Sequence, residues 1–300
     1  MKNSYPARGP FDRVVLIYNP AAGGIGPNLA RDMAGELGDR LPALPVLLQP
    51  TGFAGHAREL ARSEAAVGRP LLVSVSGDGG YNEVVNGVME VPGSGAVCTV
   101  LAAGNANDHR RSTWRSPTIE SITAGQVHRI DLLRLTLGEG AARQRLYAHS
   151  YIGFGLTPLM AIGIEKGRKG ALTELVSVVR TSVGLKPFEI ARADGARAVL
   201  DSLILANIAD MAKYGKVSEA GEPGDGLFEV ITLAHADRWR MALMVLRAAT
   251  IGLGVQPSVS QYSFRTIDPV PFQIDGEIKT VDANTAVTVE SAHRVLAVIS

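Results

Sequence analysis

The stretch "SVSGDGGYNEVVNGV", residues Ser74–Val88, decides the fold because it joins a strand pattern to a helix pattern through a turn rich in glycine. The apolar run over residues 70–77 is typical of a buried strand, and residues 81–90 predict a helix. Three glycines surround Asp78 between the two. Because glycine weakens regular structure, such a turn needs unusual backbone dihedrals or the close approach of another group.

The first third of the chain repeats this alternation of strand and helix. We expect strands over residues 13–20, 44–50, 70–77 and 96–104, and helices over residues 27–38, 54–65 and 81–90. Strands that alternate with helices form a parallel sheet covered on both faces. Ligands bind such sheets at the carboxyl ends of the strands, and the glycine-rich turns of this region fall at such ends.

Beyond about Gly125 the pattern changes to strands separated by turn residues. We expect strands over residues 128–137, 144–155, 187–195, 197–208 and 226–235, with one helix over residues 171–183. The predicted fold class is an α/β N-terminal domain with a parallel sheet, followed by a mostly antiparallel, β-sandwich-like second domain. We place the first domain at residues 1–125, with residues 288–300 packing back on it, and the second at residues 126–287.

The composition is that of an ordinary soluble globular protein. The chain has 300 residues, of which 46% are hydrophobic and 20% charged. A formal net charge of +1 means no basic excess, so nucleic acid is not an expected partner. Cys98 is the only cysteine, which excludes a disulfide framework and a cysteine zinc site. The N-terminal residues lack the apolar core of a signal peptide, so we expect a cytoplasmic protein.

Polar turns follow the predicted strands of the first domain. The turn "YNPAAGG", residues 18–24, offers backbone N–H groups to an anion. Asp78 would be repelled by a phosphate unless a cation bridges the two, so its position favours a role through Mg²⁺; the alternative is that Asp78 only caps the following helix. The segment "LAAGNANDHRR", residues 101–111, repeats the glycine, amide and acid, and Asp108 either shares the site or caps a short helix.

A late motif, "FQIDGEIKT" at residues 272–280, places Asp275 and Glu277 on either side of a glycine. By itself this pattern indicates only the tip of a hairpin. Another turn, "SEAGEPGDGLFEV" at residues 218–230, carries Asp225 and is either a plain Asp-Gly turn or a Mg²⁺ site with oxygen ligands.

Taken in order along nearly the whole chain, these motifs resemble the diacylglycerol kinase and sphingosine kinase superfamily, in its bacterial soluble lipid kinase branch. The residues that carry the resemblance are "NPAAGG" at 19–24, "TGFAGHARELA" from Thr51, "SGDGGYNEVVNG" at 76–87, "GNANDHRR" at 104–111, "GDGLFEV" at 224–230 and "DGE" at 275–277. The chain departs from the family pattern at Ser76, Gly80, Ala102 and Asn105. Two hydroxyls expected near the phosphates are therefore missing, although the Asn105 amide offers one replacement hydrogen bond. Their loss either weakens nucleotide binding or changes the phosphoryl donor.

The resemblance implies an ATP-dependent lipid kinase that transfers the γ-phosphoryl group to a lipid hydroxyl, such as that of diacylglycerol, in a cleft between the two domains. It assigns the nucleotide to Asn19, Pro20, Ala21, Ala22, Gly23, Thr51, Gly77, Asp78, Gly79, Gly80, Tyr81, Asn82, Glu83 and Asn105. Asp78 and Asp108 would organise Mg²⁺ on the phosphates. Glu277 would be the base that takes the acceptor proton, supported by Asp275. Glu222, Asp225 and Leu227 would hold a structural Mg²⁺.

Two other functions remain open from the sequence. One is a kinase for a soluble substrate, similar to NAD kinase, and the other is a nucleotide- or lipid-binding protein that has lost catalysis. The lipid kinase reading implies a substrate presented by a membrane surface, peripheral association with the inner membrane surface, and a possible homodimer. The basic run "KGRK", residues 166–169, either contacts anionic lipid or is a solvated loop.

Overall fold

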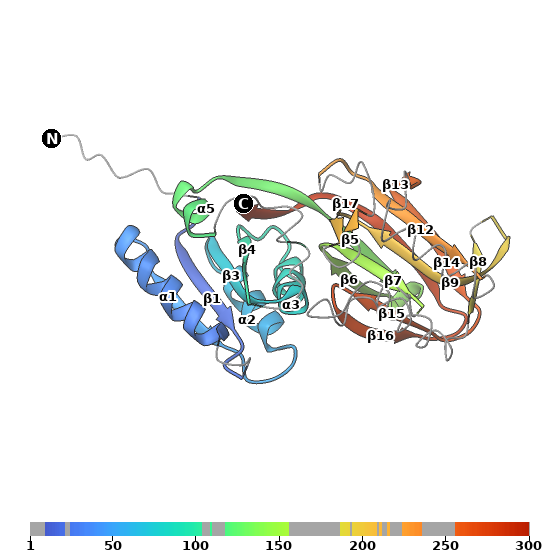
Figure 1. Cartoon of the computed structure of the whole chain (residues 1–300), viewed down its shortest axis with the longest axis horizontal. Helices are drawn as coiled ribbons and strands as arrows, with labels where there is room; N and C mark the ends of the chain where they lie inside the picture. The colour runs from blue at the N-terminus through green and yellow to red at the C-terminus, as the bar shows by residue number, and fades with distance from the viewer. Residues whose placement is uncertain are drawn as a thin grey trace. The chain divides into compact units, whose positions relative to one another are not determined.

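A computed structural model describes residues 10–21, 25–103, 109, 118–155, 187–192, 194–208, 210–211, 215–216, 224–235 and 256–299. The chain forms two compact units, one of residues 1–130 with 294–300 and the other of residues 131–293 (Figure 1). The sequence had suggested a boundary at residue 125 and a return at residue 288. Among the described residues, no helix is both long enough and apolar enough to cross a membrane.

The first unit is built on the predicted parallel sheet, which the structure confirms. Its strands are β1 (Arg13–Tyr18), β2 (Val46–Pro50), β3 (Pro70–Ser76) and β4 (Val97–Ala102). They lie in the order β4-β3-β1-β2, and each neighbouring pair is parallel. At the end of β17 (Ala286–Ile299), Val298 pairs in parallel with Cys98, so the C-terminal strand extends this sheet.

Helices cover both faces of the sheet, as the alternation predicts. They are α1 (Ile25–Arg40), α2 (His56–Ala65), α3 (Asp78–Met89) and α5 (Thr118–Ala124). Met33 and Leu37 of α1 pack with Leu16 and Val73 in one hydrophobic core. Residues that alternate with these along the strands, such as Leu72, point to the opposite face and are also buried.

The second unit is antiparallel. Its strands are β5 (Val127–Leu137), β6 (Gln144–Ala148), β7 (Tyr151–Phe154), β8 (Phe188–Arg192), β9 (Arg197–Ala206), β10 (Asp210–Met211), β11 (Gly215–Lys216), β12 (Phe228–Ala234), β13 (Ser258–Val259), β14 (Gln261–Thr266), β15 (Val270–Ile274) and β16 (Glu277–Val281), joined by most of β17. The order β16-β15-β7-β9-β8-β14-β17 is antiparallel at each step. Phe154 lies at the centre of its core, edge-on to Phe264 at 5.1 Å and stacked on Phe272 at 5.6 Å.

Two local predictions differ from the structure. The helix after β3 begins at Asp78 rather than Tyr81, so the glycines form its first turn instead of a separate loop. The strand predicted over residues 144–155 is two strands, β6 and β7, because the chain turns at His149 and Ser150 to bind a carboxylate described below. The helix predicted over residues 171–183 and the basic run at 166–169 lie outside the described residues.

Candidate active site

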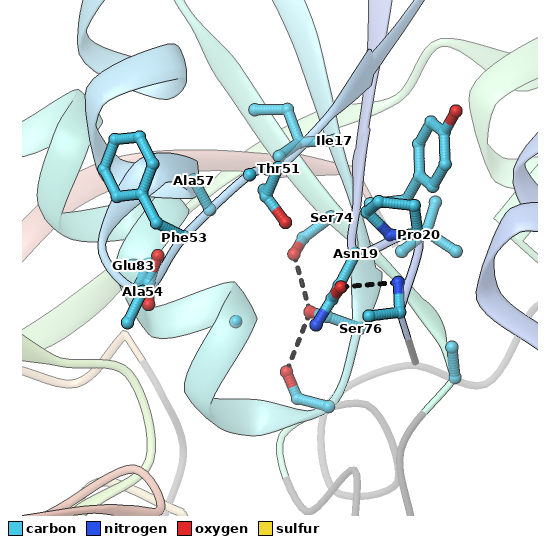
Figure 2. Close-up of a pocket in the computed structure, with 17 residues that line it drawn as sticks. Ile17, Asn19, Pro20, Thr51, Phe53, Ala54, Ala57, Ser74, Ser76 and Glu83 are labelled. Atoms are coloured by element: carbon cyan, nitrogen blue, oxygen red, sulfur yellow. Dashed lines mark hydrogen bonds between the residues drawn. The ribbon is translucent and has the colours of Figure 1, made fainter. Parts of the chain in front are cut away.

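A cavity of about 770 Å³ opens at the carboxyl ends of the parallel strands in the first unit (Figure 2). Its lining residues follow each strand: Asn19, Pro20 and Ala21 after β1, Thr51 after β2, Ser76 and Gly77 at the end of β3, and Ala103 after β4. The volume lies within the range of roughly 300–1,000 Å³ that is typical of small-molecule sites. The cavity is therefore where an open parallel sheet is expected to bind a ligand.

Two hydrogen bonds shape the turns after β1 and β2. The Asn19 Oδ1 atom accepts the N–H of Ala21 at 2.8 Å, which shapes the turn after β1. The N–H of Thr51 donates to the carbonyl of Tyr18 at 2.8 Å, which ties the end of β2 to the end of β1. Asn19 and Thr51 are thus presented to one cavity by neighbouring strands.

Helix α3 begins at the edge of the same cavity. Gly77 is its N-cap, and the first helical hydrogen bond runs from the N–H of Tyr81 to the carbonyl of Gly77 at 3.1 Å. Gly79 and Gly80 lie in the first turn of the helix, where helix geometry provides no acceptor within the helix for the backbone N–H groups. With the positive end of the helix dipole beside them, they suit an anion such as phosphate.

Asp78 is the first residue of this helix rather than its cap. Its Oδ1 atom accepts the N–H of His109 at 3.3 Å, and the His109 ring lies 5.4 Å from that of Tyr81. His109, which follows β4 in the chain, therefore lies next to Asp78. Asn105 and Asp108, which also follow β4, lie outside the described residues.

The predicted nucleotide residues divide into three groups. Those that line the cavity are Asn19, Pro20, Ala21, Thr51, Gly77, Gly80 and Glu83. Tyr81 and Asn82 are buried within α3, where the Asn82 Oδ1 atom accepts from Asn86, and with Asp78 and Gly79 they are outside the lining. Ala22, Gly23 and Asn105 lie outside the described residues.

Sequence reasoning missed Phe53 and Ser74, which also line the cavity. The Phe53 ring is exposed and stacks on His56, with centroids 4.5 Å apart and planes 8° from parallel. Phe53 lies inside the motif that starts at Thr51, but nothing in its spacing distinguishes a cavity wall from an ordinary loop residue.

The cavity holds little positive charge. Glu83 is the one charged residue among the described lining residues, and its Oε1 atom accepts the N–H of Gly55 at 3.1 Å. The described lining has no lysine or arginine. A polyphosphate bound here therefore needs a cation from elsewhere to balance its charge.

In the second unit, Asp275 lies at the turn between β15 and β16 with its carboxylate buried. That carboxylate accepts the backbone N–H groups of His149 at 2.7 Å and of Ser150 and Tyr151 at 3.0 Å each. Asp275 has a left-handed φ of 44°, which aspartate tolerates better than most residues. The side chain thus anchors the hairpin to the turn between β6 and β7.

Glu277, two residues further on, has a different environment. It is the first residue of β16, its side chain is 32% exposed, and its Oε2 atom lies 3.0 Å from the Nζ atom of Lys279. An accessible carboxylate can accept a proton from a substrate hydroxyl, whereas the Asp275 oxygens already bind backbone groups.

The turn before β12 carries the predicted structural metal residues. The Asp225 Oδ1 atom accepts the N–H of Leu227 at 2.8 Å, and the N–H of Gly226 donates to the buried Asp131 at 2.6 Å. Over the described residues, no three His, Cys, Asp or Glu side chains gather as a metal site. Glu222 lies outside those residues, so a metal at this turn stays a prediction.

One family model matches a segment that covers most of the first unit and the first residues of the second. Residues 13–135, which include β1–β4 and the cavity, match the family model of the diacylglycerol kinase catalytic domain. Among proteins with curated descriptions, none matches this sequence.

Solved structures show the same fold over nearly the whole length. A diacylglycerol kinase from Bacillus anthracis str. Sterne is 15% identical, covers 98% of each chain and gives a TM-score of 0.69. Yeast NADH kinase complexed with NADH is 10% identical, over 96% of this chain and 82% of that chain, with a TM-score of 0.50. At these identities the likeness shows the two-domain fold alone. Residues 13–135 are thus similar to the diacylglycerol kinase catalytic domain.

Proposed function

We propose that this protein is an ATP-dependent lipid kinase, which transfers the γ-phosphoryl group to a lipid hydroxyl such as that of diacylglycerol. The observation that carries the proposal is the cavity of the first unit, which lies inside the segment that matches the kinase family. The N-terminal end of α3 and the turns after β1 and β2 form its wall. Positioning and charge stabilisation dominate phosphoryl transfer, and both need such a preformed phosphate cradle.

The nucleotide would lie with its phosphates beside Gly77 and Gly80, where α3 begins and the positive end of its dipole favours an anion. Phe53, Ala54 and Ala57 are apolar residues of the same lining, and the Phe53 side chain is exposed. Aromatic faces stack well on nucleobases. The base would therefore lie against Phe53, with the ribose near Thr51.

Mg²⁺ fits the residues present. The described lining has no lysine or arginine to balance a triphosphate, and Asp78 places a carboxylate at the first turn of α3. Mg²⁺ is usually held by substrate phosphates, waters and one or two carboxylates, so Asp78 with Asp108 would suffice. The bound ion would neutralise charge on the transferring phosphoryl group.

Glu277 would take the proton of the acceptor hydroxyl, because its carboxylate is accessible. Asp275 would support it by fixing the hairpin through its backbone hydrogen bonds. A lipid acceptor would be bound at a membrane surface. Peripheral membrane association is therefore part of the proposal.

The test is phosphoryl transfer from γ-labelled ATP with Mg²⁺, using mixed micelles of several lipids and, separately, NAD as acceptors. We expect label in a lipid and none in NAD. Glu277→Gln should lower transfer by about 100-fold or more, while Glu290→Gln should not. Glu290 is the matched control, because its side chain is also 32% exposed and also pairs with a cation, Arg134, at 3.0 Å. Transfer to NAD alone, or nucleotide binding with no transfer to any acceptor, would overturn the proposal.

A further inference from the structure

In the cavity lining, the side chain of Ser76 fills the space that a side chain at Gly80 would need. A Cβ atom added to Gly80 would lie 2.6 Å from both the Cβ and the Oγ atoms of Ser76. Gly80 does not have a left-handed φ, so its backbone would accept a side chain. Only the Ser76 side chain prevents one, and the hydroxyl of Ser76 lies next to the position that a side chain at residue 80 would take.

The Ser76 hydroxyl is part of a short chain of hydrogen bonds (Figure 2). Its Oγ atom donates to the carbonyl of Gly77 at 2.9 Å and lies 2.7 Å from the Oγ atom of Ser74. Since a serine hydroxyl has one proton, Ser74 is the donor to Ser76 in this arrangement. Both serines line the cavity, and Ser74 is buried, so it holds the Ser76 oxygen in place from the sheet side.

The Ser76 proton can turn to a ligand without leaving a carbonyl unpaired. The carbonyl of Gly77 also accepts the N–H of Tyr81 at 3.1 Å, the first hydrogen bond of α3. If the Ser76 hydroxyl rotated, its hydrogen bond to the neutral carbonyl of Gly77 would be replaced by one to a charged phosphate oxygen. Hydrogen bonds to charged groups are stronger. The first-turn amides of α3 already favour an anion at this place.

We propose that Ser76 is a phosphate-binding residue of this chain. Its hydroxyl, supplied by β3, would donate a hydrogen bond to the phosphate from the place that a hydroxyl at residue 80 of α3 could otherwise take. The inference rests on the proposed nucleotide site. It makes Ser76 and Gly80 one coupled unit: either position can carry the hydroxyl, but not both.

The test uses Ser76→Ala, Gly80→Ser and the exchange variant Ser76→Gly/Gly80→Ser. Affinity for a non-hydrolysable ATP analogue with Mg²⁺ is measured by calorimetry, and the melting temperature is measured without nucleotide. Ser76→Ala should bind about tenfold more weakly, because it removes a hydrogen bond to a charged group. Gly80→Ser should lower the melting temperature, and the exchange variant should recover both the melting temperature and the affinity.

Ser94→Ala is the control, because it removes a serine hydroxyl that donates to the carbonyl of Ala65 in the same unit, away from the cavity lining. It should leave the affinity unchanged. If the parent binds but Ser76→Ala binds equally tightly, or if the exchange variant recovers nothing, this inference is wrong while the proposed function stands. If the parent itself binds no nucleotide, the proposed function fails and this inference fails with it.

Discussion

The Oδ2 atom of Asp275 binds His149 twice: it accepts the backbone N–H at 2.7 Å and lies 3.3 Å from the ring Nε2 atom. The other carboxylate oxygen accepts the N–H groups of the next two residues, Ser150 and Tyr151. This buried contact joins the hairpin that carries Glu277 to the turn between β6 and β7. It separates the roles of two acids that look equivalent in the sequence, since one is bound by the backbone and the other is accessible.

Removing the Asp275 carboxylate should destabilise the protein strongly. Asp275→Ala leaves three buried backbone N–H groups without this acceptor, and we expect a loss of about 3–5 kcal/mol in the free energy of unfolding. Asp275→Asn keeps one acceptor oxygen and should lose less. Urea unfolding measures both variants, and a loss below about 1 kcal/mol for Asp275→Ala would show that the contact is not an anchor.

Glu277→Gln, unlike Asp275→Ala, should lower activity and leave stability nearly unchanged. The side chain is partly exposed, so we expect a melting temperature close to that of the parent. If Glu277 is the base, kcat should fall by about 100-fold or more with KM little changed. Steady-state kinetics and thermal unfolding on the same preparations check this, and a fall in melting temperature that matches the loss of kcat would assign Glu277 a structural role instead.

Asp225→Ala tests the metal predicted at the turn before β12. Without Mg²⁺, the variant should lose only the hydrogen bond to the N–H of Leu227, worth about 0.5–1.5 kcal/mol. With Mg²⁺, the parent should gain stability that the variant does not. Asp194→Ala is the matched control, because the Asp194 Oδ1 atom accepts the N–H of Ala196, also two residues ahead. A difference between Asp225→Ala and the parent that stays constant across a Mg²⁺ titration would mean that no ion binds there.

Cys98 should make the protein less stable at alkaline pH. Burial raises the pKa of its thiol from 9.0 to about 12. Between these values the unfolded chain loses the thiol proton and the folded chain keeps it, so stability that is complete below pH 9 declines as the pH rises. From pH 8 to pH 10 the parent should lose about 1.4 kcal/mol more than Cys98→Ala. Equal losses in urea unfolding would contradict the raised pKa.

The sequence predicts the sheet of the first unit well because apolar runs and glycine-rich turns are local signals. The start of α3 is less clear, since Gly79 and Gly80 read as a turn although they form helix. The break between β6 and β7 depends on Asp275, whose carboxylate is 126 residues away along the chain from His149. A contact at that separation leaves no local pattern.

The residues of the candidate site likewise include some that the sequence predicts and some that it does not. Asn19, Thr51 and Gly77 belong to recognisable motifs, and the structure places them in one cavity. Ser74 reads as an ordinary strand residue, and Phe53 as a loop residue, because their importance depends on what faces them in space. The mutual exclusion of side chains at Ser76 and Gly80 likewise requires the distance between a strand and a helix.

A crystal structure with Mg²⁺ and a non-hydrolysable ATP analogue tests the central claim most directly. We predict phosphates beside Gly77 and Gly80 at the start of α3, the Ser76 hydroxyl within hydrogen-bond distance of a phosphate oxygen, and the base against Phe53. Nucleotide bound elsewhere on the chain, or a cavity that stays empty at saturating analogue, would contradict the assignment of this cavity to ATP.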